Sequence, residues 1–191
     1  MYAATPDPYC YRGTTTLKNR AGLRDQTDLE AFEAAMVTQR LDEPLPAGRL
    51  SNTHYRALHR HLFGDVYSWA GRWRTMRISK GDSMFCYPEN IDAEMRRLFA
   101  WLKKRNYLRG LDRQKFANDV AHFLSELNAI HPFREGNGRT QLAFLALLGH
   151  FTGHEINYTS IVPEQFLAAM ITSFSGDERV LAKEIFKLMQ P

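Results

Sequence analysis

Two helical patterns of apolar residues meet at residues 131–139, which read His-Pro-Phe-Arg-Glu-Gly-Asn-Gly-Arg. Apolar side chains recur at helical spacing over residues 116–130, and residues 142–151 are nearly all apolar. Pro132 cannot continue the first helix, and it disfavours helical geometry at His131. The sequence therefore predicts a helix, a tight loop and a second helix that is buried on most sides.

The rest of the sequence predicts further helices. Periodicity and helix-start signals place them at about 27–40, 52–63, 88–107, 163–173 and 177–189. The first is expected to begin at Thr27, with Glu30 three residues later as a capping box. Ser51 and Asp112 are expected to cap the helices that follow them.

A single β element is expected over residues 72–87, where helical periodicity disappears. Two short segments there flank Lys80-Gly81-Asp82-Ser83, a pattern typical of a hairpin turn. The fold class is therefore mainly α, a bundle of about six to eight helices with one β-hairpin.

Length and charge limit the classes of function. At 191 residues the chain is long enough for one well-packed domain and short for two. A net charge of +4 suits an anion such as a nucleotide, or an acidic partner, but is too weak to indicate direct nucleic-acid binding. The sequence contains neither a signal-peptide pattern nor an apolar run of membrane-spanning length. A cytoplasmic protein without membrane contact is expected.

Cysteines and histidines outside the central run give weaker signals. Cys10 and Cys86 are far apart and lack metal-ligand spacing, so reduced thiols are expected rather than a disulfide. His54, His59 and His61 do not share one helix face, which favours ordinary packing and surface roles over a metal site.

The glycines of the central run favour an anion site. Gly136 and Gly138 have no Cβ, so they can adopt left-handed angles and let a ligand approach the backbone. A helix that begins near Gly138 points unpaired N–H groups and the positive end of its dipole into the loop, which suits a diphosphate. Arg139, in the first turn, can add a forked contact to a phosphate oxygen.

Other side chains of the run favour phosphoryl or nucleotidyl transfer. His131 is placed to take a proton from an incoming hydroxyl, and Glu135 is an oxygen ligand suited to Mg²⁺. Phe133 is expected to pack into the core and fix the loop from beneath. Taken singly, a histidine before proline is usually a helix end, and Gly-Asn-Gly is usually a turn. The full combination at these spacings favours a functional site.

The run resembles the signature of the Fic family. That signature is His-Pro-Phe, two residues of which the second is acidic, Gly-Asn-Gly-Arg, two more residues and a second arginine. Residues 131–139 match every specified position. Asp7-Pro8-Tyr9 and Trp69-Ala70-Gly71-Arg72 also resemble Fic toxin domains. The resemblance implies one Fic domain over residues 1–191, a Fic-type helical bundle with an irregular N-terminal segment at 1–26, a flap at 72–87 and an active-site loop at 131–139.

The resemblance implies a protein adenylyltransferase, which transfers AMP from ATP to a serine, threonine or tyrosine hydroxyl of a target protein and releases pyrophosphate. At the matching positions, His131 would be the general base, Glu135 the Mg²⁺ ligand and Phe133 the anchor of the loop. The residues that would hold the α- and β-phosphates are Gly136, Asn137, Gly138 and Arg139.

The expected hairpin is similar to the family's flap, which would hold an extended segment of the target as an added strand. A hairpin that merely covers the core is the alternative for individual side chains. Arg72, Arg74 and Arg77 lie near it, where nucleotide or target binding and ordinary surface charge are equally compatible with the sequence. The docking edge is expected from Ile78, Ser79, Lys80, Gly81, Asp82, Ser83, Met84 and Phe85.

One position departs from the family pattern. Leu142 stands where the family has its second arginine, which helps to hold the β- and γ-phosphates and pairs with an inhibitory glutamate in regulated members. The change removes a charge-assisted contact worth roughly 1.5–3 kcal/mol. We expect ATP binding to be weakened or differently oriented, with chemistry at the α-phosphate retained. Because Leu142 lies in an apolar run, it is also expected to pack.

The family's inhibitory helix carries Ser or Thr, three residues, Glu, then Gly or Asn, and the sequence has no full match to it. A short chain of this kind resembles the toxin of a toxin–antitoxin pair, in which a small separate protein supplies the glutamate. With Leu142 in place, that glutamate would lack its usual partner. For such toxins the resemblance suggests type II DNA topoisomerase subunits as targets.

Two other functions stay open. A degenerate Fic-fold module that binds nucleotide or protein with weak or no turnover would be compatible with Leu142, although the intact His131 and Glu135 oppose it. A Doc-like phosphotransferase would share the fold, but that branch has lysine where this chain has Gly138.

Overall fold

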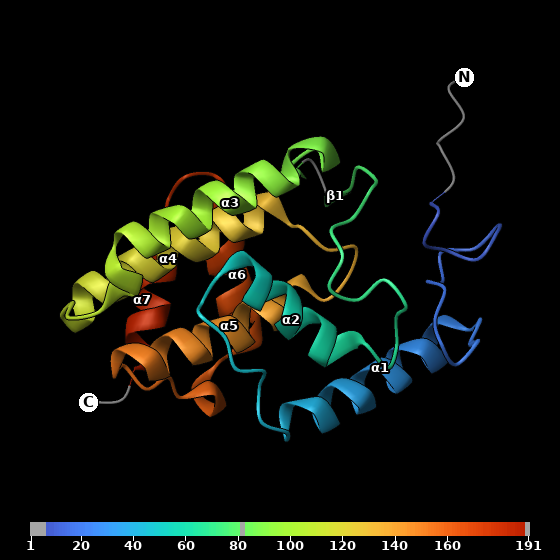
Figure 1. Ribbon diagram of the computed structural model, residues 1–191, viewed down its shortest axis with the longest axis horizontal. Helices are drawn as coiled ribbons and strands as arrows, with labels where there is room; N and C mark the ends of the chain where they lie inside the picture. The colour runs from blue at the N-terminus through green and yellow to red at the C-terminus, as the bar shows by residue number, and fades with distance from the viewer. Residues whose placement is uncertain (1–6, 81–82, 190–191) are drawn as a thin grey trace.

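The structure is a computed structural model that describes residues 7–80 and 83–189. Within these ranges the chain forms seven α-helices, two short 3₁₀ turns and one two-stranded hairpin, as expected from the sequence (Figure 1). The helices are α1 (Gln26–Leu41), α2 (Asn52–Phe63), α3 (Pro88–Lys104), α4 (Arg113–Ile130), α5 (Asn137–Thr152), α6 (Pro163–Phe174) and α7 (Arg179–Leu188). The strands are β1 (Ser79–Lys80) and β2 (Ser83–Met84), and the 3₁₀ turns are Asn106–Leu108 and Tyr158–Ser160.

Helix α4 is the centre of the bundle, in contact with α3, α5, α6 and α7. Figure 1 shows α3 and α4 side by side, with α5 and α7 below them. Helix α2 packs against both α5 and α1, and α1 lies at the edge of the molecule. This arrangement brings the C-terminal end of α4, the start of α5 and the hairpin to one side of the bundle.

The apolar spacing of α4 explains its central position. Phe116, Val120, Phe123, Leu124 and Leu127 recur three or four residues apart, and each is at most 1% exposed. Burying one such side chain contributes about 1.5–3 kcal/mol. A second, smaller apolar cluster fills the space between α1, α2 and the segment that follows α2.

Capping chemistry determined several helix starts as expected. Ser51 accepts a hydrogen bond from His54 N at 3.2 Å, and Asp112 accepts one from Lys115 N at 2.8 Å. The expected N-cap of α1, Thr27, was wrong by two residues. Its N-cap is Asp25, whose Oδ1 accepts from Thr27 N at 2.9 Å, so Thr27 lies inside the first turn. A carboxylate was available two residues earlier, and it replaces the expected capping box.

The expected end of α3 was also wrong. The helix stops at Lys104 rather than near Tyr107, because the backbone turns left-handed at Asn106 and Tyr107, with φ of 52° and 54°. Helical φ is negative, so these residues cannot continue α3.

The hairpin is shorter than the sequence suggested. Its two strands are antiparallel, with Ser79 opposite Met84 and Lys80 opposite Ser83. Phe85 N adds a bond to Ile78 O at 3.4 Å. Gly81 and Asp82, expected in the turn, lie outside the described residues. The hairpin leads directly into α3 (Figure 1).

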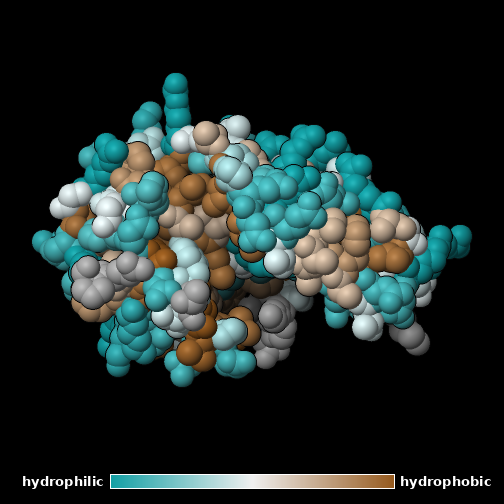
Figure 2. Space-filling view, turned by 90° about the horizontal axis from the view of Figure 1, so that it is seen from below, coloured by the Kyte–Doolittle hydropathy of each residue, from teal (hydrophilic) through white to brown (hydrophobic). Residues whose placement is uncertain are grey.

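The surface is mixed in character. Figure 2 shows separate apolar patches on one face, each bordered by hydrophilic side chains. Among the described residues, none of the helices combines the length and the apolar character needed to cross a bilayer.

Candidate active site

His131 lies where α4 ends. Its backbone is left-handed, with φ 47° and ψ 62°, and its N–H closes the helix on Leu127 O at 2.9 Å. The half-buried imidazole stacks on the ring of Phe85, with 4.0 Å between the centroids. The expected base is therefore in direct contact with a residue of the flap.

The loop after His131 is anchored by Phe133 and Asn137. Phe133 is fully buried, and its ring stacks on His59 with centroids 3.7 Å apart. The amide of Asn137 accepts from Phe133 N and donates to Phe133 O, both at 2.9 Å. Because its side chain is committed to the loop, Asn137 has its backbone N–H rather than its amide group to offer a phosphate.

His59 supports the same loop, a role that the sequence did not suggest. It is fully buried on α2; its Nδ1 accepts from Gly71 N and its Nε2 bonds to Glu135 O, both at 2.9 Å. Burial lowers the pKa of His59 to about 3, so the ring is neutral near pH 7. A neutral imidazole has one acceptor and one donor, which these two backbone groups require. No local pattern marks this role, since 76 residues separate His59 from Glu135.

The two glycines of the loop, Gly136 and Gly138, are under different structural constraints. Gly136 is the N-cap of α5 with φ of 82°, and a Cβ there would lie 2.5 Å from the ring of Phe63. Gly138 is exposed, and among the described residues a Cβ there would meet no heavy atom within 4 Å beyond its chain neighbours and the nearby backbone of its own helix. Gly136 is required by backbone and packing, whereas Gly138 faces open space.

The start of α5 offers backbone donors to a ligand. Its N-cap residue, Gly136, has no side chain that could accept from the N–H groups of the first turn. They carry the positive end of the helix dipole and adjoin the open space at Gly138. Unlike α2 and α4, whose first turns are capped by Ser51 and Asp112, α5 is suited to an anion.

Arg139 is held between two carboxylates. Its Nη2 lies 2.6 Å from Glu33 Oε1 and 3.4 Å from Glu135 Oε1. The hydroxyl of Tyr67 donates to the other oxygen of Glu33, and the guanidinium lies 4.7 Å from the centroid of the Phe63 ring. The side chain of Glu33 is only 11% exposed, so this acid from α1 is part of the site's wall.

Glu135 is the carboxylate of the loop that could hold a metal. One of its oxygens, Oε1, accepts from Gly136 N at 2.8 Å, and its side chain is 44% exposed. Among the described residues there is no group of three or more potential ligands that could hold a metal alone. Mg²⁺ usually binds through one or two carboxylates plus phosphate oxygens and water. A single accessible carboxylate beside an anion site fits that mode.

Arg134, at a variable position of the motif, ties the loop to the N-terminal segment. Its Nε and Nη2 both donate to Asp7 Oδ2, at 2.9 and 2.8 Å. Burial alone would raise the pKa of Asp7, but the bonds from Tyr9 N–H and from Arg134 outweigh it and lower the pKa. The Asp7-Pro8-Tyr9 segment thus contacts the loop directly.

The flap residues divide between surface and site. Ser79 is exposed and Met84 is 57% exposed, whereas Phe85 is only 9% exposed. The ring of Phe85 also contacts Phe174 of α6, with centroids 5.8 Å apart. Phe85, expected in the docking edge, therefore packs against His131, and Ser79 and Met84 remain accessible.

Leu142 lies one turn into α5, beyond the loop at 131–139. It follows Gly138 by four residues and Arg139 by three, which places it on the same face of α5. Its side chain is half-buried and is not among those packed against either apolar cluster. The expectation that Leu142 packs is therefore met only in part.

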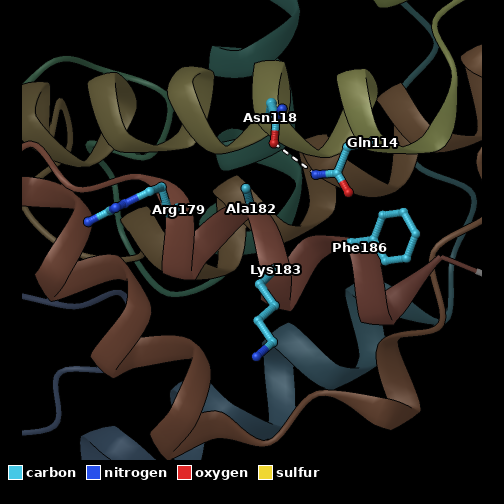
Figure 3. A pocket seen from close by; sticks show the side chains of 6 residues that line it. All are labelled: Gln114, Asn118, Arg179, Ala182, Lys183 and Phe186. Carbon is cyan, nitrogen blue, oxygen red and sulfur yellow. Dashed lines mark hydrogen bonds between the residues drawn. The ribbon is translucent and has the colours of Figure 1, made fainter.

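A hollow elsewhere on the surface lacks the motif residues. It has a volume of about 250 Å³, and α4 and α7 provide its walls (Figure 3). Gln114 donates to Asn118 across its edge at 3.1 Å. At 1.5 Å per residue, His131 is about 20 Å further along α4. The lining residues are Gln114, Asn118, Arg179, Ala182, Lys183 and Phe186.

Comparison with known proteins agrees with this geometry. The model of the Fic/DOC family matches residues 49–148, more than half of the chain. The chain belongs to the Fic/DOC family. The matched region contains α2, the hairpin, the loop at 131–139 and most of α5, whereas Asp7 and Glu33 lie before it.

Curated relatives extend the match to nearly the whole chain. A probable protein adenylyltransferase, y4lH of Sinorhizobium fredii, is 52% identical over 189 residues, 98% of both chains. The probable protein adenylyltransferase Fic of Escherichia coli is 35% identical, covering 90% of this chain and 86% of that protein. The crystal structure of BepC from Bartonella tribocorum, with bound AMPPNP, has a TM-score of 0.86 at 27% identity, with 96% of each chain covered.

These findings confirm the resemblance read from the motif and the helical fold with a flap. Its similarity to these adenylyltransferases places the chain among enzymes of the protein adenylyltransferase class.

Proposed function

We propose that this member of the Fic/DOC family transfers AMP from ATP to a hydroxyl side chain of a target protein, with His131 as general base. The observation that carries the proposal is the junction of α4 and α5. It places an imidazole at one end of a tight loop and an uncapped helix start with an open glycine at the other. The binding of AMPPNP by BepC supports ATP as the nucleotide.

The expected reaction moves one proton and exchanges one bond at phosphorus. The target hydroxyl oxygen forms a bond to the α-phosphorus, the bond from that phosphorus to the bridging oxygen breaks, and pyrophosphate leaves. The hydroxyl proton passes to the imidazole of His131. The main contribution of the protein is position and charge rather than covalent chemistry.

The phosphates would be held by the first turn of α5. Its backbone N–H groups carry the positive end of the helix dipole beside the open position at Gly138, and the guanidinium of Arg139 can offer the donors that Glu33 does not use. Glu135 fits the role of Mg²⁺ ligand, and the ion would offset negative charge on the leaving pyrophosphate. Leu142 supplies no charge at this face, so we expect weak contact with the far phosphates.

The flap would hold the target beside His131. An extended segment could add to the edge of the hairpin through main-chain hydrogen bonds, near the accessible side chains of Ser79 and Met84. Contact between Phe85 and His131 supports this placement, because a segment on the flap would lie close to the base.

We further propose that the protein is a growth-inhibiting toxin that acts in the cytoplasm. The support for this role is the likeness of residues 7–9 and 69–72 to Fic toxin domains, and the lack of a full inhibitory-helix motif in the sequence. A type II DNA topoisomerase subunit is the first target to test. A small separate antitoxin is the proposed inhibitor, and we expect growth arrest on expression to need His131.

Label transfer tests the reaction. The protein is incubated with α-labelled ATP, Mg²⁺ and a bacterial lysate, beside a His131→Ala variant. We expect a labelled protein band only with His131 present. Transfer of γ-label without α-label would indicate a phosphotransferase instead. Nucleotide binding without transfer of either label would indicate a non-catalytic binding module.

A further inference from the structure

Arg74 has an unusual environment for a charged side chain. It is 2% exposed, and all its bonded partners are backbone carbonyls. Nε donates to His131 O at 2.8 Å and Nη1 to Met76 O at 2.6 Å, while Nη2 donates to Cys86 O at 2.5 Å and to Ile130 O at 3.2 Å. Arg74 is therefore neither surface charge nor available to a ligand, the two roles that the sequence suggested.

The four carbonyls belong to two parts of the site. Ile130 and His131 form the C-terminal end of α4, while Met76 and Cys86 lie on the two stems of the hairpin. The backbone N–H of Arg74 adds a bond to Pro132 O at 2.9 Å. One residue thus joins both stems of the flap to the residue expected to act as base.

The chemistry of the helix end explains why a guanidinium occupies this position. The last carbonyls of a helix have no intrahelical donors, and Pro132 has no N–H. A cation there is favoured by the helix dipole, and a planar guanidinium can serve several carbonyls at once. Lysine, with one ammonium group, could not reach both the helix end and both stems in this way.

The position is costly, which argues against a role in stability alone. Burial lowers the pKa of Arg74, and its bonded partners in the described part of the chain are carbonyls, with no carboxylate among them. A buried charge without a paired carboxylate must be stabilised by hydrogen bonds. An apolar side chain could fill the space more simply, but it could not bind the flap and the end of α4 together.

We propose that Arg74 is a positioning residue that fixes the flap relative to His131, so that a target segment on the hairpin meets the base at a set distance. The inference rests on the proposed function. Two further contacts follow the same line: Cys86 N donates to Ala129 O at 3.0 Å, and Phe85 stacks on the His131 ring. The carbonyls that Arg74 bonds belong to the flap and the end of α4 rather than to the start of α5, so its effect is expected on the target side of the site and not on the nucleotide side.

The test uses the whole chain with Arg74→Lys and Arg74→Gln. The matched controls are Arg96→Lys and Arg96→Gln on α3, where the arginine side chain is 68% exposed. Three quantities are measured for each protein. They are the hydrogen-exchange rates of backbone amides by mass spectrometry, the rate of α-label transfer into lysate protein, and the ATP concentration at half-maximal rate. Arg74→Lys keeps the charge and carries the test if Arg74→Gln does not fold.

We expect the amides of residues 76–80 and 83–86, and those of Ile130 and His131, to exchange roughly tenfold faster in Arg74→Lys, while those of α7 keep their rates. Label transfer at saturating ATP should fall roughly ten- to hundredfold, because a misplaced reacting group costs about that much. The ATP concentration at half-maximal rate should stay the same. Arg96→Lys should match the wild type in all three measurements.

Unchanged exchange in the two segments would overturn the proposal, and so would an equal rise across the whole chain. A parallel increase in the ATP requirement would also overturn it, since Arg74 would then act on nucleotide binding. If the wild type transfers no label, the proposed function fails separately. The exchange rates would still decide whether Arg74 couples the flap to His131.

Discussion

Glu33 of α1 and Arg139 of α5 form an ion pair, with 2.6 Å between Oε1 and Nη2, across 106 residues of sequence. Tyr67 bonds the other oxygen of Glu33, so the acid is held from two sides. The same Nη2 lies 3.4 Å from Glu135. Two carboxylates therefore share one nitrogen of the motif arginine, and Glu33 has the closer contact.

Removing the charge of Glu33 should change the Mg²⁺ requirement. In Glu33→Gln, Arg139 loses its closer partner and should pair more fully with Glu135, which then competes with the metal. The side chains of Arg139 and Glu135 are 35% and 44% exposed, so a full ion pair between them is worth up to about 1 kcal/mol. The Mg²⁺ concentration for half-maximal transfer should therefore increase up to about fivefold. Titration of Mg²⁺ at fixed ATP measures this.

Tyr67→Phe is the control for Glu33→Gln. It removes one bond to Glu33 but leaves the carboxylate beside Arg139, so the Mg²⁺ requirement should change less. An unchanged requirement in Glu33→Gln would show that Arg139 and Glu135 are not coupled through Glu33.

The two loop glycines should separate stability from binding. Gly136→Ala places a Cβ 2.5 Å from Phe63 in a left-handed backbone, so it should lower the free energy of unfolding by roughly 1–3 kcal/mol. Gly138→Ala meets no heavy atom within 4 Å and gains helix propensity, so stability should stay equal or increase by up to about 1 kcal/mol.

Gly138→Ala should nonetheless weaken nucleotide binding, because the proposed phosphate site lies at this first turn of α5 and the methyl group would fill the open space at position 138. Urea unfolding measures the stabilities, and calorimetry with a non-hydrolysable ATP analogue measures binding. Wild-type affinity in Gly138→Ala would place the phosphates elsewhere.

Local chemistry made the central loop predictable. A proline at the end of a run of helical spacing, as at Pro132, cannot continue the helix. The apolar spacing on either side indicates two buried helices, so the helix–loop–helix followed from neighbouring residues. The N-caps Ser51 and Asp112 were predictable for the same reason. Even the wrong start of α1 was a local matter, since Asp25 competes with Thr27 only two residues away.

The supports of the site could not be predicted in that way. His59 bonds to Glu135 across 76 residues, and Arg74 bonds to His131 across 57. Each depends on how helices pack, and a single polar residue on a helix or before a hairpin has many possible partners. The sequence therefore indicated the chemistry of the loop, while the residues that hold it in place required the structure.

His59 should make the stability of the protein depend on pH. Burial lowers its pKa to about 3 from an ordinary value of 6.5, so between these values the unfolded chain binds a proton that the folded chain does not. The free energy that the neutral His59 contributes to folding is fully present above about pH 6.5 and is lost as the pH falls toward 3. The loss should approach about 1.4 kcal/mol per pH unit.

Urea unfolding of the wild type and His59→Gln at pH 7, 6 and 5 provides the measurement. The variant should be less stable at pH 7, because the ring packs on Phe133, but its stability should fall less steeply on acidification. Parallel pH dependence in the two proteins would contradict the assignment of a buried neutral imidazole.

Leu142→Arg should restore a missing phosphate contact. The position shares a helix face with Gly138 and Arg139 and is half-buried, so a longer side chain can extend from it toward the loop. A charge-assisted bond is worth roughly 1.5–3 kcal/mol, which corresponds to a decrease of about ten- to hundredfold in the ATP concentration at half-maximal rate. The rate at saturating ATP should change less, because the added contact lies away from the α-phosphorus.

The matched control is Leu142→Gln, which is polar but uncharged. If charge is what the site lacks, Leu142→Gln should behave as the wild type while Leu142→Arg gains affinity. Transfer of α-label is measured for all three proteins across ATP concentrations. Equal activity of wild type and Leu142→Arg at every concentration would mean that the far phosphates do not lie near this face of α5, and that the departure from the family pattern has no effect on ATP binding.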